Sequence, residues 1–523
     1  MTFNAADYLL HARVRDGIGG KQAVVGTRTS TYAELSEEVS HAAAGLRGLG
    51  LHSDDRVMLV MADDVDMAVA VLAAFHAGLV AVPVSTMFGG DELTAVMADS
   101  GARAVVTTDE FVATAATAVD RSPDVEFLLV AGASEPQVRS DVSVRSWKSV
   151  AECGDVAKVH PTGEDSWALW LYTSGTTGSP KAAMHRHANV RWVCETYGKQ
   201  TLGIRSDDIC LSIAKMFFAY GIGNSLFFPL CVGATSVFER ARPTPTIVES
   251  RLLATRPTLF FAVPTFYATL LDSVVSADAF SSVRLGVSAG EALPAALQEK
   301  FLARFGSEIL DGIGSTEALH IFLSNSPGDI KHGTTGKAVP GYELQIRDDD
   351  GKLVDAGTPG HLFVRGESIA LGYWHRTEAS RTVFEGRWLS TGDTYVRDDD
   401  GYYKCMGRSN DLLKAGGIWV SPTEVEARLL QHPAVGQAAV VGLADAAGLD
   451  KPVAVVVLSQ DHEPVTPEQL IDWCREGLAS FKRPREVVFA DDLPKTATGK
   501  LQRFRVKEQL LSNSIATAAT GVR

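Results

Sequence analysis

The chain has 523 residues, more than a single ordinary domain core accommodates, so we expect at least two domains. Apolar residues make up 46% and charged residues 21%, which is typical of a globular protein and not of a disordered one. The net charge of −14 does not favour a nucleic acid or an anionic membrane as partner, but a phosphate ligand needs only local positive charge.

The N-terminal segment MTFNAADYLLHARVRDG lacks the long apolar run of a signal peptide. The uncharged stretch 67–90 is interrupted by His76, Gly78 and Pro83, so we predict a buried helix and a short strand there rather than a membrane span. None of the six cysteines forms a CxxC metal or redox pair. We therefore expect a cytoplasmic protein without a membrane partner.

Helical and strand patterns alternate from the N-terminus onward. The amphipathic segment 36–50 predicts a helix that ends at Gly50. Short apolar runs predict buried strands at 55–62, 102–108, 257–264 and 283–290. This alternation predicts parallel sheets with crossover helices.

The sequence RDDDG occurs twice, at 347–351 and 397–401, between strand-like segments, and it predicts polar hairpin turns. After about residue 410 the pattern changes, and the segments 420–445 and 451–460 indicate a small α+β unit.

The sequence LYTSGTTGSPK at 171–181 is compatible with a surface linker and with a loop that binds a phosphate chain. Gly175 and Gly178 allow unusual backbone conformations, hydroxyl and N–H groups can donate hydrogen bonds, and Lys181 adds a cation. The spacing is not that of the standard P-loop, in which lysine directly follows the second glycine. Taken alone, the loop leaves both interpretations open.

Three further motifs are compatible with a nucleotide site. DGIGSTEALH at 311–320 places Glu317 beside hydroxyl groups on a glycine loop, as a Mg²⁺-bound triphosphate requires. The segment 390–417 supplies Asp393, which can accept hydrogen bonds from both ribose hydroxyls, together with Arg408 and Lys414. PKTATGK ends in Lys500 within a locally basic segment.

In this order, YTSGTTGSPK, GSTE, STGD, GRSND and PKTATGK resemble the motifs of the acyl-adenylate-forming enzymes. That superfamily includes acyl- and aryl-CoA synthetases, peptide-synthetase adenylation domains and firefly-type luciferases. The resemblance covers nearly the whole chain. The segments AKMFFAYGIGNSLFFPL (214–230) and DGIGSTEALHIFLSN (311–325) are similar specifically to the benzoate-CoA ligase branch.

The resemblance implies an α/β fold with two domains. The N-terminal domain, 1–409, would contain parallel sheets with crossover helices and a small β-barrel, and would bind ATP and the carboxylate. The C-terminal domain, 410–523, would be a small mobile α+β lid that carries the catalytic lysine and serves the CoA step.

The resemblance also implies roles for individual residues in ATP binding. Thr316 would contact phosphate, Glu317 would hold Mg²⁺, and Asp393 and Arg408 would contact the ribose. The phosphate loop would comprise Thr173, Ser174, Gly175, Thr176, Thr177, Gly178 and Lys181, and the adenine slot would comprise Gly290, Glu291, Ala292, Asp311, Gly312 and Ile313.

The C-terminal motifs resemble those of the two half-reactions. Lys500 would stabilise the charge that develops on the α-phosphate. The resemblance also implies that Lys414 is a catalytic residue. Gly417 would leave room for pantetheine. Asn410 stands at the hinge where the family usually has Asp or Lys, and Asn tolerates unusual backbone angles. Ile313 stands where an aromatic residue often stacks on adenine, and apolar packing can replace that stacking.

In the resembling ligases the acid lies between the AYG segment and the GSTE loop. The residues at these positions combine small and bulky side chains, which predicts a short, flat slot for a planar acid of benzoate size. They are Ala219, Tyr220, Gly314, His320 and Ile321.

The sequence thus predicts an ATP- and Mg²⁺-dependent aryl-CoA ligase for benzoate or a small substituted benzoate, such as hydroxy- or aminobenzoate, with coenzyme A as co-substrate. The alternative is a stand-alone aryl-adenylating enzyme that loads a carrier protein. A non-catalytic nucleotide-binding regulator is disfavoured, because Lys500 and Glu317 are both retained. No nucleic-acid partner is expected, and both a monomer and a homodimer are compatible with the sequence.

Overall fold

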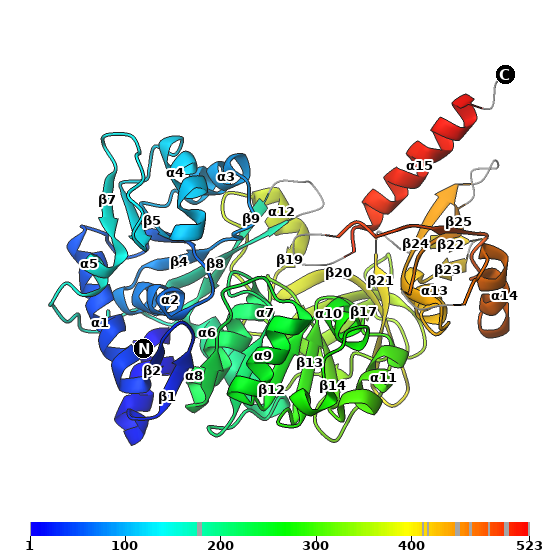
Figure 1. Cartoon of the computed structure of the whole chain (residues 1–523), viewed down its shortest axis with the longest axis horizontal. Helices are drawn as coiled ribbons and strands as arrows, with labels where there is room; N and C mark the ends of the chain where they lie inside the picture. Colours follow the sequence, from blue (N-terminus) through cyan, green and yellow to red (C-terminus); the bar gives the residue numbers. More distant parts are fainter. Residues whose placement is uncertain are drawn as a thin grey trace.

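The computed structural model describes residues 2–174, 180–409, 413–415, 418–444, 450–459, 463–479, 482–495 and 501–520. The N-terminal part contains two large, mainly parallel sheets and one antiparallel sheet, and a smaller α+β unit follows at the C-terminal end (Figure 1). The predicted α/β class is confirmed, and the antiparallel sheet corresponds to the predicted small barrel.

The first large sheet has seven strands, which are parallel except for the final pair, β8 and β9. In spatial order they are β7 (Ser143–Ser146), β6 (Phe127–Ala131), β5 (Ala104–Thr108), β3 (Arg56–Val60), β4 (Val80–Pro83), β8 (Trp167–Ser174) and β9 (Pro180–Arg186).

The second large sheet has nine strands, with a parallel centre and antiparallel edges. In spatial order they are β16 (Lys337–Ala338), β15 (Ile321–Ser324), β14 (Ile309–Gly314), β13 (Leu285–Ala289), β12 (Leu259–Ala262), β10 (Ile209–Ser212), β11 (Thr235–Val237), β1 (Gln22–Val25) and β2 (Thr29–Thr31).

The main helices of these two sheets connect and cover the strands, as expected for parallel sheets. They are α1 (Tyr32–Gly48), α2 (Val65–Ala77), α3 (Gly90–Ser100), α4 (Val112–Asp120), α5 (Trp147–Ala151), α6 (His187–Val193), α7 (Ala219–Ile222), α8 (Phe228–Val232), α9 (Pro245–Thr255), α10 (Pro264–Leu271) and α11 (Ala295–Phe305).

The predicted elements at 36–50, 55–62, 102–108, 257–264 and 283–290 correspond to α1, β3, β5, β12 and β13. The uncharged stretch 67–90 contains most of α2, which is nearly all buried, followed by β4, as predicted. No helix in the described part of the chain is long and apolar enough to cross a membrane.

The antiparallel sheet lies between the large sheets and the C-terminal unit in the chain order. It contains β17 (Glu343–Arg347), β18 (Gly360–Arg365), β19 (Phe384–Glu385), β20 (Trp388–Arg397) and β21 (Tyr403–Arg408), with α12 (Thr377–Val383) before β19. The second RDDDG segment forms the hairpin turn between β20 and β21, as predicted. The first forms a turn closed by the bridge between Arg347 and Leu353.

The C-terminal unit is α+β, as predicted, and its core includes Val425, Val440 and Val456. Its elements are β22 (Leu413–Ala415), β23 (Ile418–Val420), α13 (Pro422–Leu429), β24 (Val435–Ala444), β25 (Asp450–Leu458), α14 (Pro467–Gly477), β26 (Glu486–Phe489) and α15 (Arg503–Thr520). The domain boundary between 409 and 410 stays a prediction.

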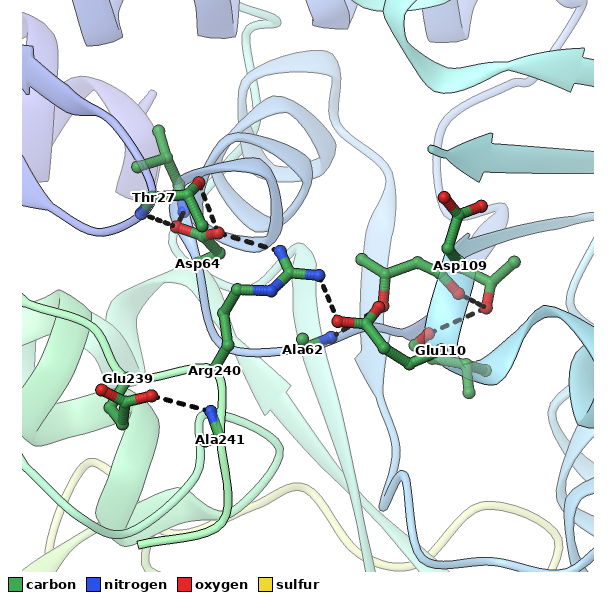
Figure 2. Close-up of polar contacts among 12 residues, drawn as sticks. Thr27, Ala62, Asp64, Asp109, Glu110, Glu239, Arg240 and Ala241 are labelled. Carbon is green, nitrogen blue, oxygen red and sulfur yellow. Dashed lines mark hydrogen bonds and ion pairs between the residues drawn. The ribbon is translucent and has the colours of Figure 1, made fainter. Parts of the chain in front are cut away.

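A group of charged side chains joins the two large sheets where β1, β3, β5 and β11 end. Arg240, after β11, donates to Asp64 Oδ2 at 2.9 Å and also to Glu110, which follows β5. Asp64 accepts two further hydrogen bonds from the backbone and hydroxyl of Thr27, at 2.9 and 2.7 Å. Figure 2 shows the Arg240 guanidinium between the two carboxylates. We refer to Thr27, Asp64, Glu110 and Arg240 as the Arg240 cluster.

Candidate active site

The predicted phosphate loop connects β8 and β9 at the edge of the seven-stranded sheet. The two strands pair in antiparallel fashion, with Thr173 opposite Lys181 and Ser174 opposite Pro180. Gly175, Thr176, Thr177 and Gly178 lie outside the described residues. The sheet therefore holds both ends of the loop and brings Thr173 and Lys181 to the same place.

Lys181 and Glu317 both contact Tyr373, one at its ring and the other at its hydroxyl. The Lys181 ammonium lies 5.5 Å from the centre of the Tyr373 ring, and the Tyr373 hydroxyl donates to Glu317 Oε1 at 2.6 Å. Burial and the adjacent Glu317 carboxylate raise the pKa of Tyr373, so its hydroxyl stays protonated and can donate. Glu317 Oε2 makes no hydrogen bond to any described residue, which leaves one carboxylate oxygen for a ligand.

The backbone of the segment Thr316–Ala318 is held at three successive carbonyl oxygens. His185 Nε2 contacts the Thr316 oxygen at 2.8 Å, and the Ala370 N–H donates to the Glu317 oxygen at 2.7 Å. The Ser368 hydroxyl donates to the Ala318 oxygen at 2.8 Å. The predicted phosphate and Mg²⁺ residues thus lie on a fixed segment, although they follow the end of a strand.

The predicted adenine residues lie at the carboxyl ends of neighbouring parallel strands. In the β13–β14 pairing Ser288 lies opposite Asp311 and Ala289 opposite Gly312, so Gly290, Glu291 and Ala292 follow β13 beside Gly312 and Ile313. Gly290 has φ of 99°, a conformation that favours glycine. The turn after β13 therefore lies beside the end of β14, and the adenine role of these residues stays a prediction.

Asp311 is only 5% exposed, and its Oδ1 has no partner among the described residues. Burial raises the pKa of this carboxyl well above its ordinary value. A buried polar atom without a partner is costly in a folded protein, so a ligand that donates a hydrogen bond here would relieve it. An adenine amine is such a donor.

The predicted ribose residues pair across two strands of the antiparallel sheet. Asp393 of β20 lies opposite Arg408 of β21, and Arg408 Nε lies 3.2 Å from Asp393 Oδ1. Arg408 also donates to the Thr391 carbonyl at 3.0 Å. The sequence pattern indicated both residues, and the strand pairing brings them together.

Three of the predicted acid-binding residues lie between the end of β14 and the start of β15. Gly314 pairs with Ile321, and a Cβ at Gly314 would lie 2.5 Å from the His320 carbonyl oxygen, so only glycine fits there. Leu319, which is buried, has φ of 68°, a strained value for a side-chain-bearing residue. Such strain is typical of functional segments.

The other two predicted acid-binding residues lie in α7, and His320 contacts one of them, Tyr220. Its ring centre is 5.6 Å from that of Tyr220, and its Nε2 lies 3.4 Å from the Tyr220 carbonyl oxygen. Ala219 precedes Tyr220 and is 7% exposed. Burial lowers the pKa of His320 to about 3, so the ring is neutral at ordinary pH. His320 Nδ1 has no partner among the described residues.

The loop before α7 is held by two charged residues that the sequence did not single out, the buried Asp63 and the partly buried Lys215. Both oxygens of Asp63 accept from the Met216 N–H, at 3.2 and 3.0 Å. The Lys215 ammonium donates to the carbonyls of Glu239 and Ala241 at 2.5 and 2.8 Å. These contacts connect the acid-binding segment to the polypeptide that carries the Arg240 cluster.

Several predicted C-terminal residues cannot be placed. Asn410, Gly417 and Lys500 lie outside the described residues, and only the backbone of Lys414, in β22, is described. The N–H of Leu501, which follows Lys500 in the sequence, donates to Glu291 Oε1 at 3.3 Å. This contact joins the C-terminal unit to the predicted adenine turn.

Sequence reasoning missed Tyr373, His185 and Asn189. Tyr373 lies outside the recognised motifs, and its contact with Glu317 spans 56 positions. His185 and Asn189 are four residues apart in the segment after the phosphate loop, His185 near the end of β9 and Asn189 near the start of α6. No group of three or more His, Cys, Asp or Glu that could hold a metal occurs among the described residues. Mg²⁺ bound mainly by phosphates and one carboxylate does not need such a group.

Comparison with known proteins agrees with this geometry. The AMP-binding enzyme family matches residues 12–374, and the AMP-binding enzyme C-terminal domain matches residues 424–500. A benzoate–CoA ligase of Thauera aromatica is 42% identical over 512 residues, which cover 97% of this chain and 96% of the relative.

Two solved structures are similar over nearly the whole chain. A benzoate CoA ligase from Burkholderia xenovorans LB400 is 44% identical with a TM-score of 0.88, over 96% of this chain and 99% of that one. The anthranilate CoA ligase AuaEII in complex with anthranoyl-AMP is 37% identical with a TM-score of 0.90, over 97% of each chain. The protein therefore belongs to the AMP-binding enzyme family.

Proposed function

We propose that this protein is an AMP-forming aryl-CoA ligase for benzoate or a small substituted benzoate. The observation that carries the proposal is that the segment 311–321 joins three sets of residues. It begins at the buried Asp311 acceptor, continues through Glu317 beside Tyr373 and Lys181, and ends at His320 beside Tyr220. A nucleotide and a small acid bound along this segment would lie next to each other.

The first half-reaction would join the acid to AMP. A carboxylate oxygen of the acid attacks the α-phosphorus of ATP, the bond to the β-phosphate oxygen breaks, and pyrophosphate leaves with the electron pair. Lys181 would neutralise the charge of the phosphates, and Lys500 would stabilise the negative charge that develops on the α-phosphate. In the second half-reaction the CoA sulfur attacks the acyl carbon, and AMP leaves.

The residues present fit Mg²⁺ as part of this proposal. Glu317 would hold the ion with one oxygen while Tyr373 keeps the other in place. When bound, the ion would reduce the negative charge on the phosphates. A cytoplasmic location and a homodimer remain predictions.

The acid-binding residues favour a planar, short acid. His320 is enclosed by Tyr197, Tyr220 and Phe228, with ring centres 5.2, 5.6 and 4.5 Å away. The Tyr220 hydroxyl donates to the Val287 carbonyl at 2.9 Å, so towards a substrate it can only accept. His320 Nδ1 can likewise accept, because Nε2 faces a carbonyl. Both groups would therefore favour a ring substituent that donates, such as hydroxyl or amino.

A carboxylate panel tests the proposal. Pyrophosphate release and thioester formation with free CoA are measured for benzoate, the three hydroxybenzoates, 2-aminobenzoate, octanoate and acetate. We expect both products, with the highest kcat/KM for a benzoate-type acid. Preference for octanoate or acetate would contradict the aryl assignment. Pyrophosphate release without thioester would favour the enzyme that loads a carrier protein, and neither product would favour a regulator.

A further inference from the structure

We infer that His185 and Asn189 are positioning residues for adenylation, because together they fix the backbone of the Thr316–Ala318 segment. The expected effect on adenylation rests on the proposed function. The positioning itself rests on hydrogen bonds between described residues. Both residues are more than 120 positions away from the segment in the sequence, so the GSTE motif does not indicate their contacts with it.

The hydrogen bonds determine which nitrogen of His185 carries the proton. Asn189 Nδ2 lies 3.0 Å from His185 Nδ1, and Asn189 Oδ1 accepts from Arg186 Nε at 3.0 Å, which fixes the orientation of the amide. The Asn189 amide nitrogen can only donate, so His185 Nδ1 must accept. His185 Nε2 therefore carries the hydrogen and donates it to the Thr316 carbonyl at 2.8 Å.

Asn189 also supports a second series of hydrogen bonds to the same segment, through Ser368. Its Nδ2 donates to the Ser368 carbonyl at 2.8 Å, and Ser368 in turn donates its hydroxyl to the Ala318 carbonyl. The Tyr342 hydroxyl lies 2.6 Å from Ser368 Oγ and completes this group as a donor. One amide thus supports both the His185–Thr316 contact and the Ser368–Ala318 contact.

The environment makes this arrangement rigid and electrically neutral. His185 and Asn189 are fully buried. Burial lowers the pKa of His185 to about 4, so the imidazole is uncharged near neutral pH. His185 touches a backbone carbonyl and not a reacting atom, so its effect on the reaction must pass through the position of Thr316 and Glu317. A displacement of about 1 Å at a reacting centre can cost roughly 100-fold in rate.

Two substitutions at His185 separate this role from simple packing. His185→Gln keeps an amide N–H near the position of Nε2 and can still donate to Thr316. His185→Asn places its amide near Nδ1, reaches Asn189 and cannot reach Thr316. His76→Asn is the matched control, because His76 is also buried and its Nε2 also contacts a backbone carbonyl, that of Ala157, at 3.1 Å.

The first readout is amide hydrogen exchange of the free protein, which needs no substrate. We expect His185→Asn to speed exchange of the Leu319 and Ala370 amides, which donate to the Thr316 and Glu317 carbonyls, and His185→Gln to leave them protected. The His76 variant should leave both amides unchanged. Equal protection in the two His185 variants would overturn the inference.

The second readout is kinetic. For His185→Asn we expect kcat of benzoate-dependent pyrophosphate exchange to fall about 10- to 100-fold, with KM for the acid changed less than about threefold. His185→Gln should recover most of the loss, and thioester formation from supplied aryl-AMP should fall less. Equal losses in both half-reactions, or in His76→Asn, would overturn the inference. If the wild-type protein shows no exchange with any aryl acid, the proposed function fails, and hydrogen exchange still decides the positioning role.

Discussion

The Thr316–Ala318 segment and the loops of the Arg240 cluster both lie at strand ends. Side chains fix both regions, but with different chemistry. The segment is held by neutral donors, such as buried His185 and Ser368, on backbone carbonyls. The cluster in Figure 2 is held by an ion pair, in which the Asp64 side chain is 3% exposed and that of Arg240 is 32% exposed.

This difference has a physical consequence. The neutral contacts depend little on salt, and they engage the backbone of the segment and not the Glu317 side chain. In the cluster the opposite charges of Asp64 and Arg240 pair with each other. Burial alone would raise the pKa of Asp64, but hydrogen bonds from Thr27 and Arg240 outweigh burial and hold the pKa below its ordinary value. From this difference we expect the first region to serve the proposed site and the second to stabilise the fold.

The largest effect is expected at the carboxylate of the site. Glu317→Gln keeps the acceptor for Tyr373 but removes the charge, so we expect adenylation to slow by about 10²- to 10³-fold with a small change in Tm. Pyrophosphate exchange measures this. The matched control, Glu110→Gln in the Arg240 cluster, should retain nearly full activity, and an equal loss in the control would remove the distinction between the regions.

The next largest effect is expected on stability at Asp64. Asp64→Ala leaves the Thr27 N–H, the Val65 N–H at the start of α2 and Arg240 without their acceptor, so we expect a loss of about 3 kcal/mol in the free energy of unfolding. Urea unfolding measures it. The folded fraction should keep the wild-type kcat. A variant of normal stability with impaired adenylation would show that the cluster serves the site directly.

A smaller effect is expected from pH. The pKa of His185 is about 4 in the folded protein because of burial, and about 6.5 when unfolded. The unfolded chain therefore binds more protons below pH 6.5, and the contribution of His185 to stability, complete above that pH, is lost as pH falls towards 4. The expected slope is about 1.4 kcal/mol per pH unit for one proton.

Urea unfolding of wild type and His185→Gln between pH 4 and 7 tests this. The difference between their free energies of unfolding should change over this range and stay constant above pH 7. A difference that is independent of pH throughout would show that His185 is not buried as a neutral ring.

The smallest effect is expected at an exposed ion pair. Arg28 binds both oxygens of Glu38, with side chains 42% and 34% exposed, so Arg28→Gln should cost no more than about 1 kcal/mol. Salt should reduce even this cost. A loss as large as that of Asp64→Ala would contradict the view that burial, and not charge alone, gives the Arg240 cluster its strength.

The sequence by itself determined the element pattern and the principal motifs. Apolar runs on both faces of the strands require burial, which predicts parallel sheets, and β3, β5, β12 and β13 lie where these runs occur. Motif residues such as Asp393 and Glu317 could be named because their chemistry suits a nucleotide. Their roles stay predictions, and so do those of Asn410, Gly417 and Lys500, which lie outside the described residues.

Only the tertiary structure decided which groups support the motifs. Tyr373 meets Glu317 across 56 positions and His185 meets Thr316 across 131, and no local pattern encodes contacts between segments so far apart. The same holds for Asp63 and Met216, which lie in the loops after β3 and β10 of different sheets, 153 positions apart. Periodicity records which face of an element is buried, whereas a hydrogen bond between two loops depends on how whole sheets pack, and that is fixed only when the chain has folded.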